Sequence, residues 1–146
     1  MNIAEILKNK SVDTKLWSPL FGGGYFKNID TNNNIMVQPF DVDLPILTFT
    51  PDGKYLNVLD GECLLFPSKY MQDWSKFAWK RGDVLANKEG STYCIFKDWY
   101  KEDYTQANVM YWVNPYGRIF ENQSLIDSLH LVEPDKAKYY IKIIEA

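Results

Sequence analysis

Residues 92–113, TYCIFKDWYKEDYTQANVMYWV, contain two apolar runs on either side of a short charged segment. Residues 92–100 and 107–113 are rich in aromatic and β-branched side chains, which favour strands, whereas residues 101–106 have the polar character of a hairpin tip. The alternation in the first run predicts a shift of phase at Asp98. We therefore expect an antiparallel hairpin, and this hairpin indicates a mainly β protein.

Short predicted strands continue on both sides of this hairpin. In the second half of the chain they are residues 83–87, 118–121 and 129–132, with a turn at 114–117. In the first half they are residues 15–21, 25–29, 35–40, 46–50 and 62–66. Short strands at spacings of roughly 8 to 12 residues are typical of a small antiparallel barrel or sandwich. The three glycines at residues 22–24 predict a tight turn between the first two strands.

Helical patterns lie at the two ends of the chain. Near the start, Asn2 can cap a helix, and Glu5 sits three residues later, as in a capping box. Near the end, Pro134 suits a first helical position, and apolar residues then recur at helical spacing, so we expect a helix docked on the second β unit. The predicted organisation is an N-terminal helix and a first β unit in residues 1–68, a crossing segment in residues 69–82, and a second β unit with a C-terminal helix in residues 83–146.

The composition of the 146 residues excludes several classes of protein. Hydrophobic residues make up 46% and charged residues 24%, as in a folded globular domain, and no apolar window is long enough to span a membrane. The start of the chain lacks the pattern of a secretory signal, so we expect a cytoplasmic protein. The net charge of −3 gives no basic field for phosphate, which argues against a nucleic-acid partner.

His130 is the single histidine and thus the one ready general base. It alternates with apolar neighbours in SLHLV, which favours a structural role, and a small hydrolase or nucleotide-handling enzyme using His130 with Asp127 is the alternative. Cys63 and Cys94 lie in apolar runs, where a reduced thiol behaves as a small hydrophobe, and no zinc-site spacing is present. We expect no catalytic residue, no metal and no cofactor.

The chain is rich in aromatic residues, with 8 Phe, 10 Tyr and 5 Trp. Consecutive strand residues point to opposite faces, so one member of each pair Trp99–Tyr100 and Tyr111–Trp112 lies outside the core of its own sheet. Such residues either pack under the crossing segment and the terminal helix or form an exposed patch for a partner. The candidate ligand-binding or partner-binding residues are Trp74, Trp79, Trp99, Tyr100, Tyr111 and Trp112.

The middle of the chain resembles a known group of sequences. The motifs TPDGKYL, DGECLLFPSK and DWSKF between residues 50 and 77, followed by KRGDVL and YCIFK, are similar to an uncharacterised protein family of Bacteroidales gut bacteria and their phages. The segments NIAEILKN and TKLWSPLFG near the start resemble the opening of that family. The resemblance implies a cytoplasmic protein of a bacterial mobile element or phage, and it implies no reaction, cofactor or catalytic residue.

The first unit also resembles SH3-like barrels of the KOW and Tudor type, through SPLFGGGYFKNI and the later TPDG. Such barrels generally bind proteins, peptides or nucleic acids rather than catalyse reactions, although one fold hosts many functions. We therefore expect two small antiparallel SH3-like barrels or sheets with a short helix at each end. The expected function is a non-enzymatic binding module for an unknown protein or small molecule, and nucleic-acid binding through Lys15, Lys27 and Lys54 is a further alternative.

Overall fold

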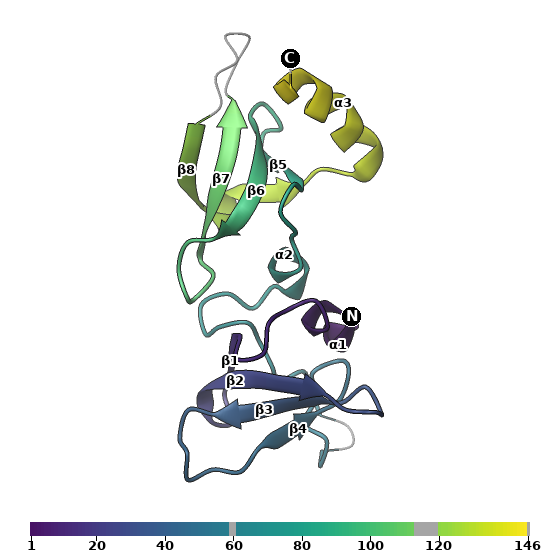
Figure 1. Ribbon diagram of the computed structural model, residues 1–146, viewed down its shortest axis with the longest axis vertical. Coiled ribbons are helices and arrows are strands. Elements are labelled where there is room, and N and C mark those ends of the chain that lie inside the picture. Colours follow the sequence, from purple (N-terminus) through teal and green to yellow (C-terminus); the bar gives the residue numbers. More distant parts are fainter. Residues whose placement is uncertain (59–60, 113–119, 146) are drawn as a thin grey trace. The chain divides into compact units, whose positions relative to one another are not determined.

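The computed structural model describes residues 1–58, 61–112 and 120–145 (Figure 1). The chain forms two compact units, Met1–Trp74 and Ser75–Ala146, and each unit has its own sheet. Antiparallel strands dominate both units, so the prediction of a mainly β protein with two antiparallel sheets is confirmed. Within the described residues, neither sheet closes into a barrel.

The first unit begins with helix α1 (Ile3–Leu7). Asn2 caps this helix as predicted, because its side-chain oxygen accepts a hydrogen bond from the Glu5 backbone N–H at 3.1 Å. The Ile3 backbone N–H donates to the carbonyl of Pro51 at 2.8 Å, and the helix buries its apolar side. A helix of this length is not stable alone, so these contacts with the rest of the unit hold it.

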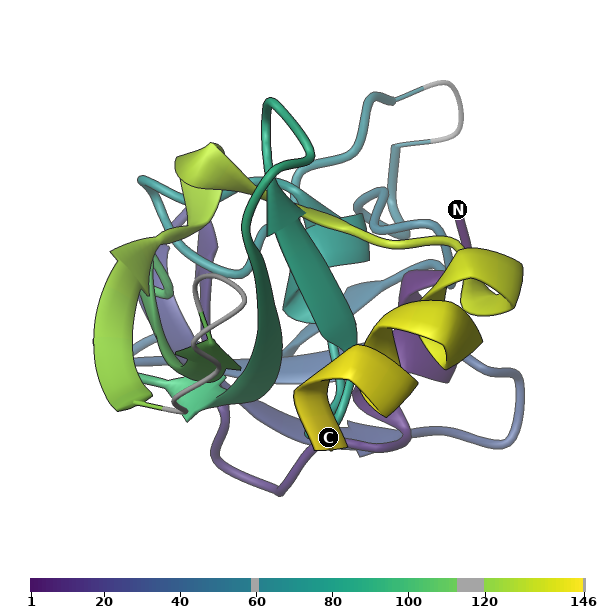
Figure 2. The same ribbon diagram turned by 90° about the horizontal axis from the view of Figure 1, so that it is seen from above.

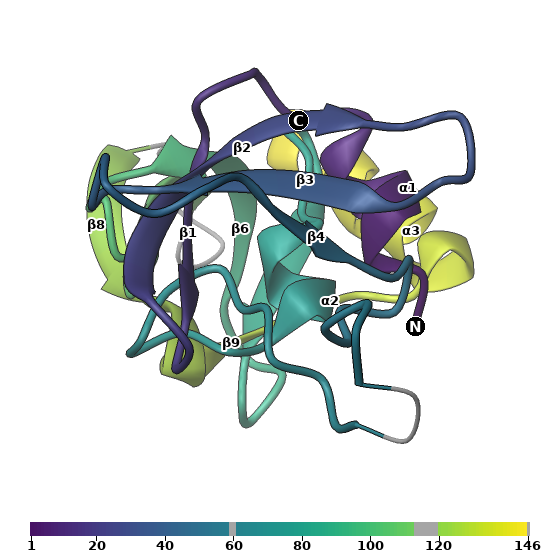
Figure 3. The ribbon, with the colours of Figure 1, turned by 90° about the horizontal axis from the view of Figure 1, so that it is seen from below.

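Four antiparallel strands form the sheet of the first unit, in the order β1-β2-β3-β4 (Figure 3). Their bounds are Lys15–Ser18 for β1, Gly22–Ile29 for β2, Ile35–Pro39 for β3 and Leu47–Phe49 for β4. Burial alternates along β3, where Ile35 and Val37 are fully buried and Met36 between them is not. The core of this unit therefore lies on the face that carries Ile35 and Val37.

The three consecutive glycines lie inside β2, so the turn predicted for them is wrong. The turn comes earlier, at residues 19–21. A Cβ at Gly23 would clash with the ring of Phe40, and a Cβ at Gly24 would lie 2.8 Å from the ring of Phe21. Gly23 and Gly24 thus let two aromatic rings lie directly against the strand backbone. Glycine within a strand often marks such a close approach.

The strand predicted at residues 62–66 is also absent from the described structure of this unit. This segment makes two isolated bridges, Lys54 with Cys63 and Trp17 with Phe66. The backbone N–H groups of Trp17 and Phe66 each donate to the other residue's carbonyl at 2.8 Å. The segment therefore covers the outer edge of β1 at one point instead of running alongside a neighbouring strand.

The outer edge of β4 is covered in a similar way. The Leu56 N–H donates to the Thr48 carbonyl at 3.1 Å, and the Thr50 N–H donates to the Lys54 carbonyl at 2.7 Å. These bonds come from the loop that follows β4. Both edges of the first sheet thus have backbone partners from the same unit.

Five antiparallel strands form the sheet of the second unit, in the order β8-β7-β6-β5-β9. Their bounds are Val84–Asn87 for β5, Tyr93–Trp99 for β6, Gln106–Trp112 for β7, Phe120–Leu125 for β8 and Leu129–Leu131 for β9. Helix α2 (Trp74–Phe77) spans the boundary between the units, the 3₁₀ turn η1 (Ile126–Ser128) joins β8 to β9, and helix α3 (Pro134–Glu145) ends the chain.

The hairpin predicted from residues 92–113 is formed by β6 and β7. Its register shifts between Phe96 and Asp98, which confirms the predicted change of phase. The turn predicted at residues 114–117 lies outside the described residues, as does the start of the strand predicted at 118–121.

The connection between β8 and β9 shows that the second sheet is curled. Turn η1 has 3 residues, yet it joins the two strands at opposite edges of the sheet. In a flat sheet, four inter-strand steps of about 4.8 Å would separate those edges by roughly 19 Å. The Cα atoms of Leu125 and Leu129 are four residue steps apart, which reach about 15 Å at most. The sheet must therefore bend, and Figure 2 shows the second unit from the side on which this bend is visible.

The two faces of the second sheet have different surroundings. The outer face carries Val84, Ala86 and Val132, which form a buried cluster with Tyr93 and with Ala137 of α3. This packing confirms the predicted docking of the C-terminal helix on the second β unit. The inner face is the opposite one, and it is the face that lines the largest cavity described below.

Candidate functional site

A cavity of about 360 Å³ lies on the inner face of the second sheet. We call it the sheet cavity. It is lined by Asn87, Thr92, Cys94, Val109, Asn122, Ser124, Ser128 and Leu129. A volume of this size is at the lower end of the range of ligand pockets.

The strand register explains why these residues meet. Val109 of β7 is paired with Phe96 of β6 on one side and with Asn122 of β8 on the other, so these three residues share one face. Cys94 and Ser124 are two residues away from Phe96 and Asn122 along their strands, and therefore lie on the same face. The floor of the cavity is thus apolar, and its β8 wall is polar.

The described residues that line the sheet cavity carry amides and hydroxyls, and none of them is Asp, Glu, Lys, Arg or His. Some of these polar groups organise the surrounding backbone. The Asn87 side-chain oxygen accepts hydrogen bonds from the Ser91 and Thr92 N–H groups at 2.9 and 3.2 Å, and the Ser128 hydroxyl donates to the Leu125 carbonyl at 2.7 Å.

The Ser124 hydroxyl of β8 is held less tightly. The Ser124 hydroxyl donates to the Asn122 side-chain oxygen across 3.5 Å, which is longer than the 2.5–3.0 Å of an ordinary hydroxyl hydrogen bond. A ligand atom with good geometry would therefore replace this bond at little cost. Thr92, Asn122 and Ser124 are the side chains best placed to bind such an atom.

The Cys94 thiol on the cavity floor is chemically quiet. Desolvation by burial raises the pKa of the Cys94 thiol to about 12. The reactive thiolate is therefore scarce near neutral pH, and the thiol acts as part of the apolar floor.

A second, smaller cavity of about 280 Å³ shares Asn87 and Ser128 with the sheet cavity. Its other lining residues are Lys88, Glu89, Leu125 and Asp127. Charged groups thus lie beside the sheet cavity and not within it.

His130 lies on the opposite face of the sheet from Cys94. Ala86 is paired with both Tyr93 and His130, whereas Cys94 is paired with the preceding residue, Leu85. A Cys94–His130 pair is therefore impossible in this fold, because adjacent strand positions point to opposite faces. His130 is exposed and lines a separate cavity of about 240 Å³ together with Glu133 and Lys136, whereas Asp127 does not line that cavity.

Trp79 and Trp99, two of the predicted site residues, come together in an aromatic cluster of the second unit. Their rings are stacked with centroids 6.1 Å apart and an interplanar angle of 8°. Phe77 also stacks on Trp99 at 6.1 Å, and Tyr104 meets Phe77 edge-on at 4.8 Å. Trp79 is only 4% exposed, so its ring packs in the core and offers no surface to a partner.

The other predicted site residues are dispersed. Trp74 belongs to the first unit, where it is 5% exposed and its indole N–H donates to the Leu65 carbonyl at 2.9 Å. Tyr100 follows β6 and is 47% exposed. Tyr111 and Trp112 are backbone positions of β7, paired with Cys94 and Tyr93, and their side chains lie outside the described part of the structure. Among the described side chains of the second unit, Trp79 and Trp99 are the members of this set that the structure brings together.

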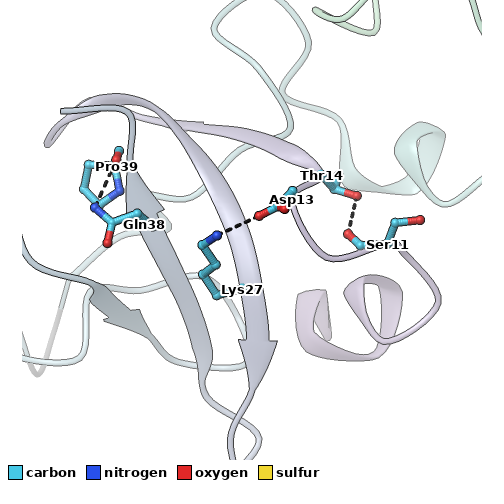
Figure 4. A network of polar contacts seen from close by, with 6 residues as sticks. All are labelled: Ser11, Asp13, Thr14, Lys27, Gln38 and Pro39. Carbon is cyan, nitrogen blue, oxygen red and sulfur yellow. Dashed lines mark hydrogen bonds and ion pairs between the residues drawn. The ribbon is translucent and has the colours of Figure 1, made fainter. Parts of the chain in front are cut away.

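Two of the three lysines considered for nucleic-acid contact lie beside carboxylates. The Lys27 ammonium is 2.7 Å from Asp13 (Figure 4), and the Lys54 ammonium is 3.7 Å from Asp52. These ion pairs reduce the positive potential of that surface, which nucleic-acid binding would need.

The described ranges of the chain contain no group of three or more His, Cys, Asp or Glu residues that could hold a metal ion. They also contain no helix that is long and apolar enough to cross a membrane.

Comparison with known proteins finds no matching family model, no matching curated protein and no matching solved structure. The resemblance to a Bacteroidales and phage family therefore stays a prediction. The case for function rests on the geometry of the sheet cavity.

Sequence reasoning missed the polar wall of this cavity. Asn122 and Ser124 occur in FENQSL, a segment for which we predict no functional role from the sequence. The available signal was their spacing of two residues, which places both side chains on one face of a strand.

Proposed function

We propose that this protein is a non-enzymatic binding module whose second unit holds a small, uncharged polar group in the sheet cavity. The observation that carries the proposal is the lining of the cavity, in which the described residues place amides and hydroxyls above an apolar floor, with a neutral thiol as their one ionisable group. Such a combination of apolar surface and a few polar groups is typical of ligand sites.

The lining also favours one class of ligand over others. An ionised carboxylate, phosphate or amine would lose its hydration on entry and would meet no opposite charge there, which is costly. An amide or an alcohol would instead exchange water for the side chains of Thr92, Asn122 and Ser124. We expect neutral amides and alcohols to bind, and charged groups to be rejected.

The resemblance of the sequence supplies the setting that we propose for this activity. It points to the cytoplasm of a bacterium and to a phage or other mobile element as the source of the protein. In that setting the module would recognise a protein or a small molecule without transforming it.

Four small probes test the proposal by nuclear magnetic resonance. N-methylacetamide and glycerol are neutral, whereas acetate and methylammonium are charged, and each is added at the same concentration to ¹⁵N-labelled protein. We expect the two neutral probes to shift the amide signals of Thr92, Asn122 and Ser124, and the two charged probes to leave them in place.

A pair of variants locates the binding. Ser124→Leu places a large side chain on the cavity wall and should abolish the shifts, whereas Gln123→Leu, on the opposite face of the same strand, should retain them. Shifts that follow the charged probes, or that persist unchanged in Ser124→Leu, would contradict the proposal.

A further inference from the structure

The outer edge of β8 is an open hydrogen-bonding edge. Strand β8 is the terminal strand of its sheet and pairs with β7 on its inner side. Among the described residues, no backbone bond from another strand or loop reaches Glu121 or Gln123 of β8, whereas the Leu125 carbonyl at the end of the strand accepts from the Ser128 hydroxyl at 2.7 Å. This differs from the first sheet, where both terminal strands have partners.

The register shows which peptide groups point outward. The Ile126 N–H donates to the Thr105 carbonyl at 3.1 Å, so Thr105 and Ile126 form a hydrogen-bonded pair at the end of the β7–β8 ladder. Bonded and non-bonded pairs alternate along an antiparallel ladder. Residues 120, 122 and 124 therefore bond to β7, and the peptide groups of Glu121, Gln123 and Leu125 face away from the sheet.

This edge lacks the usual protection against strand pairing. Natural edges are blocked by proline, lysine, inward charges or short length. Strand β8 has 6 residues, FENQSL, without proline or lysine. Its one charge, Glu121, is bound by the Lys97 ammonium at 2.9 Å. Glu121, Gln123 and Leu125 are all exposed to solvent.

The open edge and the sheet cavity belong to the same strand. Asn122 and Ser124 line the cavity with their side chains, while the peptide groups of their neighbours form the edge. A strand added beside β8 would place every second side chain on the inner face, next to Asn122 and Ser124. Peptide recognition by strand addition works in this way, because backbone bonds give affinity and pockets for alternate side chains give specificity.

We propose that β8 accepts an extended segment of a partner protein as a sixth strand, and that inward side chains of this segment fill the sheet cavity. The inference rests on the proposed function and names its ligand as a peptide. Inward residues of the segment are neutral and polar, such as Asn, Gln, Ser or Thr, because the cavity lining is uncharged. The residue beside Glu121 is neutral or basic, because like charges on adjacent strands repel.

A single strand fits this edge better than a second copy of the chain. The short link η1 keeps the end of β8 close to β9 on the curled sheet, so the space beside β8 is narrow at that end. One extended segment needs about 4.8 Å in the plane of the sheet, whereas another copy would bring its whole five-stranded sheet. A partner segment also supplies free side chains for the cavity.

The probe for this proposal is a display library of random heptapeptides, screened against the full chain. Gln123→Pro removes one outward N–H and leaves the bonds to β7, so it should weaken the selected peptides tenfold or more. Gln123→Ala keeps the N–H and should bind them as the unchanged chain does. The selected sequences should carry Asn, Gln, Ser or Thr at alternate positions.

Hydrogen exchange gives a second measurement that needs no variant. The amides of Glu121, Gln123 and Leu125 should exchange rapidly in the free protein and slow down when a selected peptide is bound. The amides of Asn122 and Ser124 should be protected in both states.

Three outcomes would overturn the inference: no heptapeptide selected, equal binding by Gln123→Pro, or an edge that is filled by dimers of the chain itself. Binding of neutral probes in the cavity without any effect at the edge would leave the proposed function standing and defeat only this inference. Peptide binding that Ser124→Leu leaves unchanged would overturn the filling of the cavity by inward side chains, whereas loss of neutral-probe binding in the unchanged chain would defeat the proposed function.

Discussion

The two sheets of this protein differ most at their edges. In the first unit, a bridge from Phe66 covers β1, and the loop around Leu56 covers β4. In the second unit, the outward peptide groups of Glu121 and Gln123 on β8 have no backbone partner among the described residues. Both edges of the first sheet are therefore covered, β1 at one point and β4 around Leu56, whereas the edge of β8 is the one that we propose for an added strand.

The comparison extends to the faces of the sheets. Buried positions of β3 in the first unit are occupied by Ile35, Val37 and Pro39, which fill a core. The corresponding wall of the second sheet carries Asn122 and Ser124 over a cavity. Asn122 is exposed and Ser124 is half-buried, so this wall is open to solvent, and our proposals place binding on this strand because it carries both the polar wall and the open edge.

Core truncations should have the largest effects, and they should be similar in the two units. Phe49→Ala in the first unit and Trp79→Ala in the second each remove a buried ring, at an expected cost of about 3–5 kcal/mol in the free energy of unfolding. Denaturant titration followed by circular dichroism measures both. Ile46→Ala, at a position that is 48% exposed, is the control and should cost about 0.5 kcal/mol or less. A small loss of unfolding free energy in Trp79→Ala would mean that Trp79 lies on the surface and is available to a partner.

Proline at the two edges should have unequal effects, which tests the comparison directly. Leu56→Pro removes the N–H that donates to the Thr48 carbonyl and should destabilise the first unit by about 1–3 kcal/mol more than Leu56→Ala. Gln123→Pro removes an outward N–H and should cost less than about 1 kcal/mol relative to Gln123→Ala. Equal costs at the two edges would show that β8 has a partner and would remove the contrast.

These edges also show what sequence reasoning can and cannot supply. Local signals were sufficient for the Asn2 cap, for the hairpin with its irregularity at Asp98, and for the helix that starts at Pro134. Each depends on residues close together in the chain. The glycines of β2 were misassigned because Phe40, which packs over Gly23, is distant in sequence.

The candidate site was missed for a related reason. Alternate polar residues in a strand face either water or a cavity, and the choice depends on the curl of the whole sheet. That curl arises because β9 pairs with β5 while the short link η1 ties β9 to β8. Patterns within single strands do not reveal this pairing between distant strands. Trp74 and Trp79, which the sequence favours as binding residues, are buried in the structure.

Two tryptophans offer a matched comparison of polar groups in the two units. The Trp74 indole N–H donates to the Leu65 carbonyl, whereas the Trp99 Nε1 atom is buried without a partner in the described part of the chain. Trp74→Phe removes the N–H that donates to the Leu65 carbonyl, whereas Trp99→Phe removes a buried N–H that has no partner and is therefore costly. Trp74→Phe should therefore cost about 1–2 kcal/mol more than Trp99→Phe in denaturant titration. Equal costs would mean that the Trp99 indole has a partner.

The smallest expected effect concerns the thiol on the cavity floor at alkaline pH. Burial raises the pKa of Cys94 from its ordinary value of 9.0 to about 12 in the folded chain. The folded state thus keeps this proton when the unfolded state has lost it, so the contribution to stability is complete below pH 9 and declines between pH 9 and pH 12. By pH 10, the folded chain should have lost about 1 kcal/mol relative to Cys94→Val, measured as the difference between their unfolding free energies at pH 7 and pH 10.

Cys63 in the first unit provides the control for this last comparison. Desolvation also raises the pKa of the Cys63 thiol, but this residue is only half-buried. Cys63→Val should therefore change the pH dependence of the unfolding free energy less than Cys94→Val does. If the unfolding free energies of the unchanged chain and of Cys94→Val depend on pH in the same way, water or a charged group reaches the cavity floor. A neutral, dry floor is what the proposed selection of uncharged groups requires, so this pH profile tests the cavity independently of any ligand.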